Sequence, residues 1–205
     1  MAIIIIDDIE QGTPEWMALR LGNPGAGNIS KIITTKGDPS KQRDDYMRQL
    51  AGEIITGQHE DTFQSIHMEN GLIREAEARS LFEMIHEVTI RRVALVYKDA
   101  QKMFHVSPDG LIGDNAGLEV KCPMMKTQVK YLLENKLPTD YFSQVQMSLY
   151  VCECEYWWFM SYFAGLPPLI LKIERDEAFI SKLKAELEKF VVELALVVRK
   201  LREMT

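Results

Sequence analysis

Segments with helical periodicity alternate along this chain with short apolar segments typical of strands. The clearest helical pattern lies near the C-terminal end, where apolar residues recur every three or four positions. They are Ile180, Leu183, Leu187, Phe190, Val191, Leu194, Val197, Val198 and Leu201. Asp176 precedes this stripe and is expected to cap the helix. The stripe predicts a packing surface, either within the chain or between subunits.

The other elements are predicted from their patterns and end signals. Thr13 and Pro14 suit the N-cap and first position of a helix, and Gly57 suits the end of another. Helices are predicted from Pro14 to Gly22, from Asn28 or Ser30, over Asp44–Ile55, Met68–Glu87 and Met124–Asn135, and from Thr139 or Asp140. Strands are predicted over Ile3–Ile6, Val88–Tyr97, Lys102–Ser107, Glu155–Phe163 and Leu169–Glu174. This order predicts a single α/β domain over residues 1–205, with a central mixed β-sheet flanked by helices.

A hairpin is predicted between Ser107 and Lys121. The turn formers of residues 113–117 connect its two strands, so Asp109 should return beside Glu119. Side chains alternate along a strand, so Glu119 and Lys121 point the same way. Two adjacent carboxylates repel unless a cation lies between them, and hard oxygen ligands suit Mg²⁺ or Mn²⁺. A lysine beside such a cation suits phosphate chemistry.

A purely structural interpretation of this pattern is also open. A Glu-x-Lys pair on an exposed strand face usually contributes only ~0–1 kcal/mol. The neighbouring residues Leu111, Ile112, Leu118, Val120 and Cys122 are apolar, however, so at least one side of the strands should be buried. Charges in such a setting need compensation, which favours the metal site.

Composition limits the function class. The 205 residues are 46% hydrophobic and 26% charged, as in ordinary globular proteins, and the net charge of −6 argues against a nucleic-acid coat protein but not against a nuclease. Ile3–Ile6 is too short to span a membrane and lacks the flanks of a signal peptide, so a cytoplasmic location is expected. Three cysteines fit a reducing compartment better than a disulfide framework.

The glycine-rich loop after residue 22 is a candidate anion site. Free N–H groups at a helix start favour phosphate, and Arg20 lies just upstream. A plain linker between helices is the alternative interpretation.

The ordered motifs together resemble the lambda-exonuclease family, the phage-type alkaline exonucleases of the PD-(D/E)xK nuclease superfamily. They are E-Q-G-x-x-x-W-x-x-L-R-L-G from Glu10, G-x-x-x-E-x-x-A-R-x-L-F-E from Gly71, S-P-D-G-L from Ser107, G-L-E-V-K-C-P from Gly117, Q-V-Q-x-S from Gln144 and I-E-R-D-E from Ile173. Each motif alone is weak, whereas their order and spacing are specific. The resemblance implies a restriction-endonuclease-like core.

The resemblance also implies residue roles. Asp109 and Glu119 would bind Mg²⁺ with the carbonyl of Val120, and Glu75 would reach the site through water or a second metal. Lys121 would activate the attacking water, and Gln144 would hold that water or the scissile phosphate. Arg20 and Ser107 would bind a terminal 5′-phosphate, and Met68 would be an apolar wedge at the end base pair. The family usually has Thr-Ala-Ser where this chain has Gly25-Ala26-Gly27, so backbone N–H groups, Asn28 or Ser30 would replace the hydroxyl contacts.

Further expectations follow from the family. Its members digest one strand of double-stranded DNA from 5′ to 3′, which implies Mg²⁺-dependent, processive digestion that leaves 3′ overhangs for recombination by strand annealing. The expected partners are DNA ends, two further copies in a ring-shaped homotrimer, and a phage single-strand annealing protein. The setting would be a bacterial host, with the chain encoded by a phage or prophage.

Two other functions fit these residues less well. A helicase-linked or CRISPR-associated PD-(D/E)xK nuclease with a metal cluster needs four cysteines, and this chain has three. A scaffold that binds DNA ends without cutting them predicts the loss of a metal ligand or of the lysine. Asp109, Glu119 and Lys121 are all present, which disfavours the scaffold.

Overall fold

The strands of the described residues form two sheets rather than one. The computed structural model describes residues 2–59 and 66–204, with side chains from Arg74 onwards in the second range. One sheet is antiparallel, in the order β1 (Ile4–Ile6), β2 (Leu95–Tyr97) and β3 (His105–Val106). The other is mixed, in the order β4 (Gly110–Ile112), β5 (Ala116–Lys121), β6 (Tyr156–Ser161) and β7 (Leu169–Glu174), with β5 and β6 parallel. The predicted α/β class with a mixed sheet is therefore confirmed.

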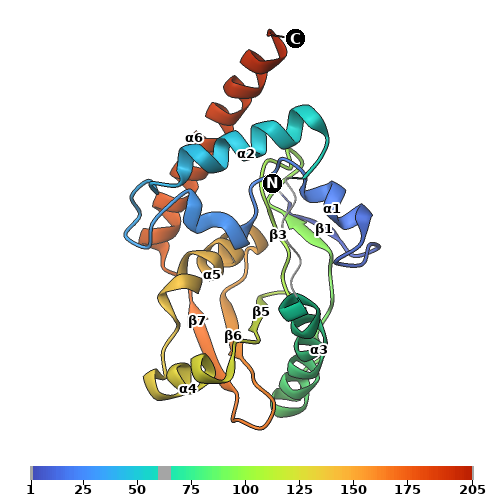
Figure 1. The fold of residues 1–205 in the computed structure, drawn as a ribbon. Coiled ribbons are helices and arrows are strands. Elements are labelled where there is room, and N and C mark those ends of the chain that lie inside the picture. Colours follow the sequence, from blue (N-terminus) through green and yellow to red (C-terminus); the bar gives the residue numbers. More distant parts are fainter. Residues whose placement is uncertain (1, 60–65, 205) are drawn as a thin grey trace.

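Helices lie around both sheets (Figure 1). They are α1 (Pro14–Arg20), α2 (Arg43–Thr56), α3 (Ile66–His86), α4 (Met125–Glu134), α5 (Thr139–Cys152) and α6 (Glu177–Arg202), with a 3-10 helix, η1, at Ala26–Lys31. The predicted caps are confirmed: Thr13 Oγ1 accepts from the Trp16 N–H, Asp176 Oδ1 accepts from the Phe179 N–H, and α2 ends at Gly57. Helix α3 lies alongside β5, and α5 packs against both sheets and η1.

Two predicted strands are wrong over most of their length. Of Val88–Tyr97, only Leu95–Tyr97 is a strand, because the preceding residues cross between the sheets. Arg91 forms a bridge with Leu111 of β4, where its N–H donates to the Leu111 carbonyl at 2.8 Å. Of Lys102–Ser107, only His105–Val106 is a strand, and Lys102 has a φ of 52° that ends any extended run. The helix expected from Asn28 or Ser30 is the short η1, which begins earlier, at Ala26.

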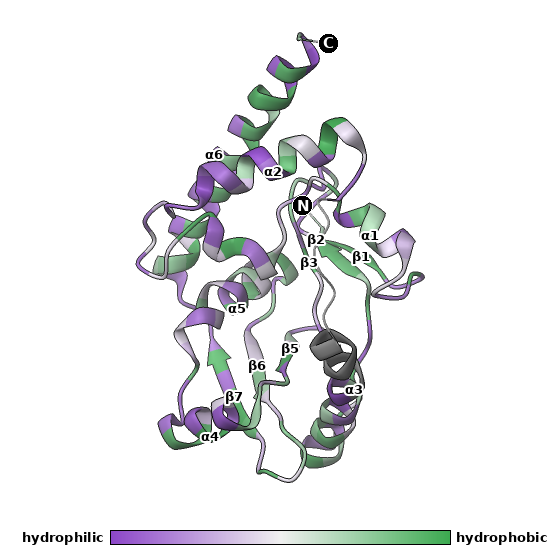
Figure 2. Cartoon of the chain, in the orientation of Figure 1, coloured by the Kyte–Doolittle hydropathy of each residue, from purple (hydrophilic) through white to green (hydrophobic). Residues whose placement is uncertain are grey.

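The apolar stripe of α6 closes the main core, as predicted. Its residues Phe179, Ile180, Leu183, Leu187, Phe190, Val191, Leu194 and Val198 are buried. Tyr46 of α2 stacks on Phe190 with the ring centroids 5.9 Å apart. Figure 2 shows the two faces of α6 as alternating hydrophobic and hydrophilic stretches, and its C-terminal end extends beyond α2. Within the described residues, no helix combines the length and apolar character that a membrane span requires.

Candidate active site

The predicted hairpin forms and brings two carboxylates together. Strands β4 and β5 are antiparallel with Gly110 opposite Leu118, which places Asp109 opposite Glu119 at the open end of the hairpin. Asp109 Oδ2 accepts a hydrogen bond of 2.6 Å from the N–H of Val120. The bond fixes the Asp109 side chain against the strand that carries Glu119, while its other oxygen lies outside this bond.

Lys121 and Gln144 both reach Glu119. The Lys121 Nζ lies 2.5 Å from Glu119 Oε1, and Gln144 Nε2 donates to the same oxygen at 2.6 Å. Glu119 is only 3% exposed, so these bonds compensate a buried charge. Gln144 comes from α5, which packs against β5 and β6. Because both donors use Oε1, the Oε2 atom is outside these two bonds.

Glu75 approaches the site from α3. Its carboxylate forms an ion pair with Arg79, one turn along the helix. Its negative charge also acts on Asp109, where it is one of the causes that raise the pKa of that carboxyl. Glu75 is thus a neighbour of the site that is held by its own arginine.

The charges of the site are out of balance. Burial, together with the charges of Glu119 and Glu75, raises the pKa of Asp109 well above its ordinary value. Burial alone would lower the pKa of Lys121, but Glu119 and Asp109 outweigh it and raise that pKa. The site therefore contains the carboxylates of Asp109, Glu119 and Glu75. Lys121 is paired with Glu119, and Arg79 is paired with Glu75. The hard oxygen atoms and excess negative charge fit a divalent cation such as Mg²⁺ or Mn²⁺.

The side chains are not yet arranged around such a cation. Among the side chains of residues 2–59 and 74–204, no three acidic, histidine or cysteine groups converge closely enough to hold a metal ion. Lys121 engages Glu119, and Arg79 engages Glu75. A cation bound by Asp109 and Glu119 would compete with the lysine for the Glu119 carboxylate.

A second polar site surrounds Arg20 at the end of α1. The Arg20 guanidinium lies over the Trp16 ring, 3.9 Å from its centroid, and Arg20 Nε donates to His105 Nε2 at 3.4 Å. Burial lowers the pKa of Arg20 and lowers that of His105 to about 3, the latter with help from the Arg20 charge. Histidine 105 is therefore a neutral acceptor at any working pH, and Arg20 supplies the positive charge.

A cavity of about 130 Å³ opens beside Arg20. Its lining includes Asn28, Tyr46, Glu53 and His105. Burial raises the pKa of Tyr46 to about 12, and Gly25, Arg20 and Asn28 oppose this shift. The Glu53 carboxylate accepts from the Gly22 N–H at 3.0 Å and acts electrostatically on Arg20. The cavity therefore contains a cation and neutral donors, with one acid at its wall.

Three residues predicted for DNA binding have other placements or no description. Ser107 donates to the Ala94 carbonyl at 3.0 Å and accepts from Trp16 Nε1 at 3.1 Å, so its hydroxyl is already engaged. Ser30 is exposed and does not line the cavity. The side chain of Met68 lies outside the described residues.

Several neighbours of these sites were missed by the sequence predictions. Tyr46 and His105 line the Arg20 cavity, and Tyr141 lies beside Lys121. Only Tyr141 had a local signal, because it is three residues before Gln144 and on the same helix face. His105 fills the space above Gly25, where an added Cβ would lie 2.7 Å from its Nε2. The imidazole of His105, on β3, therefore occupies the space that a side chain at position 25 would need.

Comparison with known proteins places the chain in a family. Residues 15–155 match the YqaJ-like viral recombinase domain. The alkaline exonuclease LHK-Exo from Laribacter hongkongensis is similar with 28% identity and a TM-score of 0.84, over 94% of this chain and 97% of the other. Its complex with dAMP gives a TM-score of 0.85 at the same identity and coverage. A phage-related exonuclease from Haemophilus somnus 129PT shares the fold at 13% identity, with a TM-score of 0.62 over 89% of this chain and 96% of the other.

No curated protein matches the chain. The domain match covers more than half of its length, and the similarity to the alkaline exonuclease extends over most of both chains. The chain therefore belongs to the YqaJ-like viral recombinase family, as its resemblance to the lambda-exonuclease family predicted.

Proposed function

We propose that this chain is a Mg²⁺-dependent DNA exonuclease that digests one strand of double-stranded DNA from 5′ to 3′. The observation that carries the proposal is the placement of Asp109 opposite Glu119, with Lys121 and Gln144 on the Glu119 carboxylate. The similarity to the alkaline exonuclease of Laribacter hongkongensis supports the assignment of a DNA-degrading enzyme that acts in recombination. A scaffold that only binds DNA would need none of these four groups together.

Each residue of the candidate active site would have its own role in hydrolysis. Asp109, Glu119 and the Val120 carbonyl would hold Mg²⁺, with Mn²⁺ as a substitute, and Glu75 would act through water or at a second cation. When bound, the cation would supply Lewis-acid stabilisation of the charge that develops on the scissile phosphate. Lys121 would orient and activate the attacking water through its ammonium. Gln144, one bond from Glu119, would hold that water or the phosphate.

Metal dependence is the first test. Removal of divalent cations with EDTA is expected to abolish digestion of linear duplex DNA, because Asp109, Glu119 and Glu75 repel one another and the phosphate without a cation. Addition of Mg²⁺ or Mn²⁺ should restore it, as measured by the release of nucleotides over time. Full digestion in EDTA would contradict the proposal.

Lys121 is expected to act in the chemical step more than in binding. Lys121→Ala should lower the single-turnover cleavage rate by roughly 10²-fold or more, because an interaction made in the transition state changes the rate selectively. The affinity for DNA ends, measured with Ca²⁺ in place of Mg²⁺, should fall much less. Normal single-turnover cleavage by this variant would exclude the role.

The Arg20 cavity is proposed as the site of the terminal 5′-phosphate. A guanidinium matches phosphate oxygens with two bonds and keeps its charge at any working pH. Asn28 and Gly25 both line the cavity, so they support the predicted replacement of family hydroxyl groups. Ser107, which is held by Trp16 and Ala94, would fix the wall rather than contact phosphate. Met68 is retained as a proposed wedge and Ser30 as a proposed contact with DNA.

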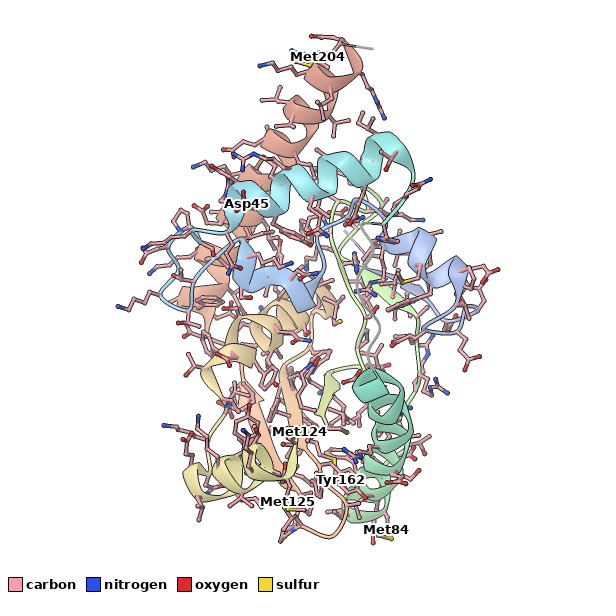
Figure 3. All side chains as sticks on the ribbon, in the orientation of Figure 1. Asp45, Met84, Met124, Met125, Tyr162 and Met204 are labelled. Atoms are coloured by element: carbon pink, nitrogen blue, oxygen red, sulfur yellow. The ribbon has the colours of Figure 1, made fainter. Side chains whose placement is uncertain are left out.

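The assembly and its setting are proposed from the same family. We propose one catalytic domain over residues 1–205 that assembles as a ring-shaped homotrimer, digests processively and hands its 3′ strand to a phage single-strand annealing protein. Large apolar side chains on the surface support contacts with other chains. Met84, Met124 and Met125 are 57–71% exposed and project at the opposite end of the molecule from Met204 (Figure 3). The proposed setting is the cytoplasm of a bacterial host, with a phage or prophage origin.

A further inference from the structure

Tyr141 lies beside the proposed catalytic lysine and has no part in the mechanism above. It is in the first turn of α5, three residues before Gln144. The Lys121 Nζ lies 5.1 Å from the centroid of the Tyr141 ring, within the range of a cation–π interaction. The same ammonium is 2.5 Å from Glu119 Oε1. Lys121 therefore has two partners, a carboxylate and the face of an aromatic ring.

The Tyr141 ring is held in place from two sides. It packs on Phe159 with the centroids 5.4 Å apart, and Phe159 is paired with Glu119 across β5 and β6. On its other side it acts on Tyr131 of α4, a buried residue whose pKa is raised to about 12 by burial and then by Tyr141. Because a strand neighbour and a helix neighbour both contact it, the ring keeps the same face toward Lys121.

The two partners of Lys121 differ in what a divalent cation does to them. A cation on the Glu119 carboxylate competes with the ammonium for that group and repels it. The face of the ring attracts a lysine ammonium but provides no carboxylate oxygen for a metal. When a divalent cation binds the Glu119 carboxylate, the Tyr141 ring is the partner that remains for the Lys121 ammonium.

We propose that Tyr141 is a positioning residue whose ring holds the Lys121 ammonium when a divalent cation takes Glu119. This proposal rests on the proposed function, because it needs a cation at Asp109 and Glu119. Without the ring, a displaced lysine would lose its second partner and return to the carboxylate. Loss of the ring should therefore weaken cation binding, and it should do so only while position 121 carries a charge.

The test is a double-mutant cycle on cation binding in the absence of DNA. Binding of Mn²⁺ is measured by calorimetry for the wild-type protein, Tyr141→Leu, Lys121→Met and the double variant. Tyr141→Leu is expected to raise the Kd for Mn²⁺ roughly 3- to 10-fold, as for loss of one cation–π partner. Lys121→Met should lower the Kd, because it removes the competitor. In the Lys121→Met background, Tyr141→Leu should have no effect.

Tyr141→Phe is the matched control, since it keeps the ring and removes only the hydroxyl. It should bind Mn²⁺ like the wild-type protein, and melting temperatures should show that each variant is folded. In single-turnover cleavage, Tyr141→Leu should lower the rate while its affinity for DNA ends stays unchanged.

The outcomes separate this proposal from the function on which it rests. If Tyr141→Leu weakens Mn²⁺ binding equally with and without Lys121, or does not weaken it, the positioning role is wrong and the nuclease assignment stands. If the wild-type protein binds no Mn²⁺, the metal-dependent function and the positioning role are both overturned.

Discussion

Asp109→Asn and Glu119→Gln are each expected to lower the rate of DNA digestion by at least ~10³-fold, which corresponds to about 4 kcal/mol of barrier. Both substitutions keep the shape of the side chain and remove the charge. Asp109→Asn can still accept from the Val120 N–H, and Glu119→Gln can still accept from Gln144. The loss would therefore report the missing ligand charge rather than a change of the hairpin. Initial rates on linear duplex DNA at saturating Mg²⁺ measure it.

Although Asp109→Asn should lower activity, it is expected to leave the stability of the folded protein unchanged or to raise it. The folded-state pKa of Asp109 is raised, so the folded protein binds this proton more tightly than the unfolded chain. The associated stability is present at low pH, and is lost as the pH rises from the ordinary carboxyl range through the raised pKa. In EDTA at neutral pH, Asp109→Asn should melt at the same temperature as the wild-type protein or higher, with the difference vanishing in acid.

The digestion rate and the melting temperature are measured on the same variants, so each measurement is a control for the other. A variant that is inactive and less stable would show a damaged fold instead of a lost ligand. A variant with wild-type activity would remove Asp109 or Glu119 from the cation site. Asp114, an exposed acid in the turn of the same hairpin, offers a matched control, and Asp114→Asn should leave digestion and stability unchanged.

Arg20→Ala is expected to lower digestion of 5′-phosphorylated ends by roughly 10²-fold while hardly affecting hydroxyl ends. The substitution removes a bidentate, charge-assisted contact with the terminal phosphate. A hydroxyl end cannot form this contact, so its digestion should hardly change. Each processive run should also become shorter, because the bound phosphate keeps the strand aligned between cuts. Initial rates on the two substrates, with product-length analysis on a long duplex, measure both effects.

The competing explanation is that Arg20 only stabilises α1. Its guanidinium lies on Trp16, and Glu53 acts on it electrostatically, so a structural role has visible contacts. In that case Arg20→Ala would lower the melting temperature and slow both substrates equally. Arg20→Lys distinguishes further, since it keeps the charge without the two-bond geometry and should restore only part of the preference for phosphate.

The sequence was most informative where the chemistry is local. Asp109 and Glu119 are separated by one short turn, so turn formers and strand alternation were enough to predict that they meet. Gln144 and Glu75 lie on helices far from the hairpin, and only the family motifs pointed to them. The contact of Gln144 with Glu119 depends on how α5 packs against β5, which periodicity does not determine, whereas the Glu75–Arg79 pair follows from the spacing within α3.

The sequence was least informative where distant segments meet. The strand predicted over Val88–Tyr97 fails because Arg91 bridges to β4 while Leu95–Tyr97 pairs with β1 and β3. The surroundings of Arg20 come from α1, α2, η1 and β3, so neither Tyr46 nor His105 could be assigned to them from spacing. The serine at 107 looked available in the sequence, but the Trp16 indole and the Ala94 carbonyl engage it.

The contact between Gly25 and His105 has a consequence for how this protein can vary. The two residues form a parallel bridge, and the imidazole occupies the volume that a side chain at position 25 would need. A serine or threonine could enter at 25 only together with a smaller residue at 105, and a smaller residue at 105 alone would leave a void beside Arg20. Evolution should therefore exchange the two positions as a pair, and related sequences should divide into two compatible combinations with few intermediates.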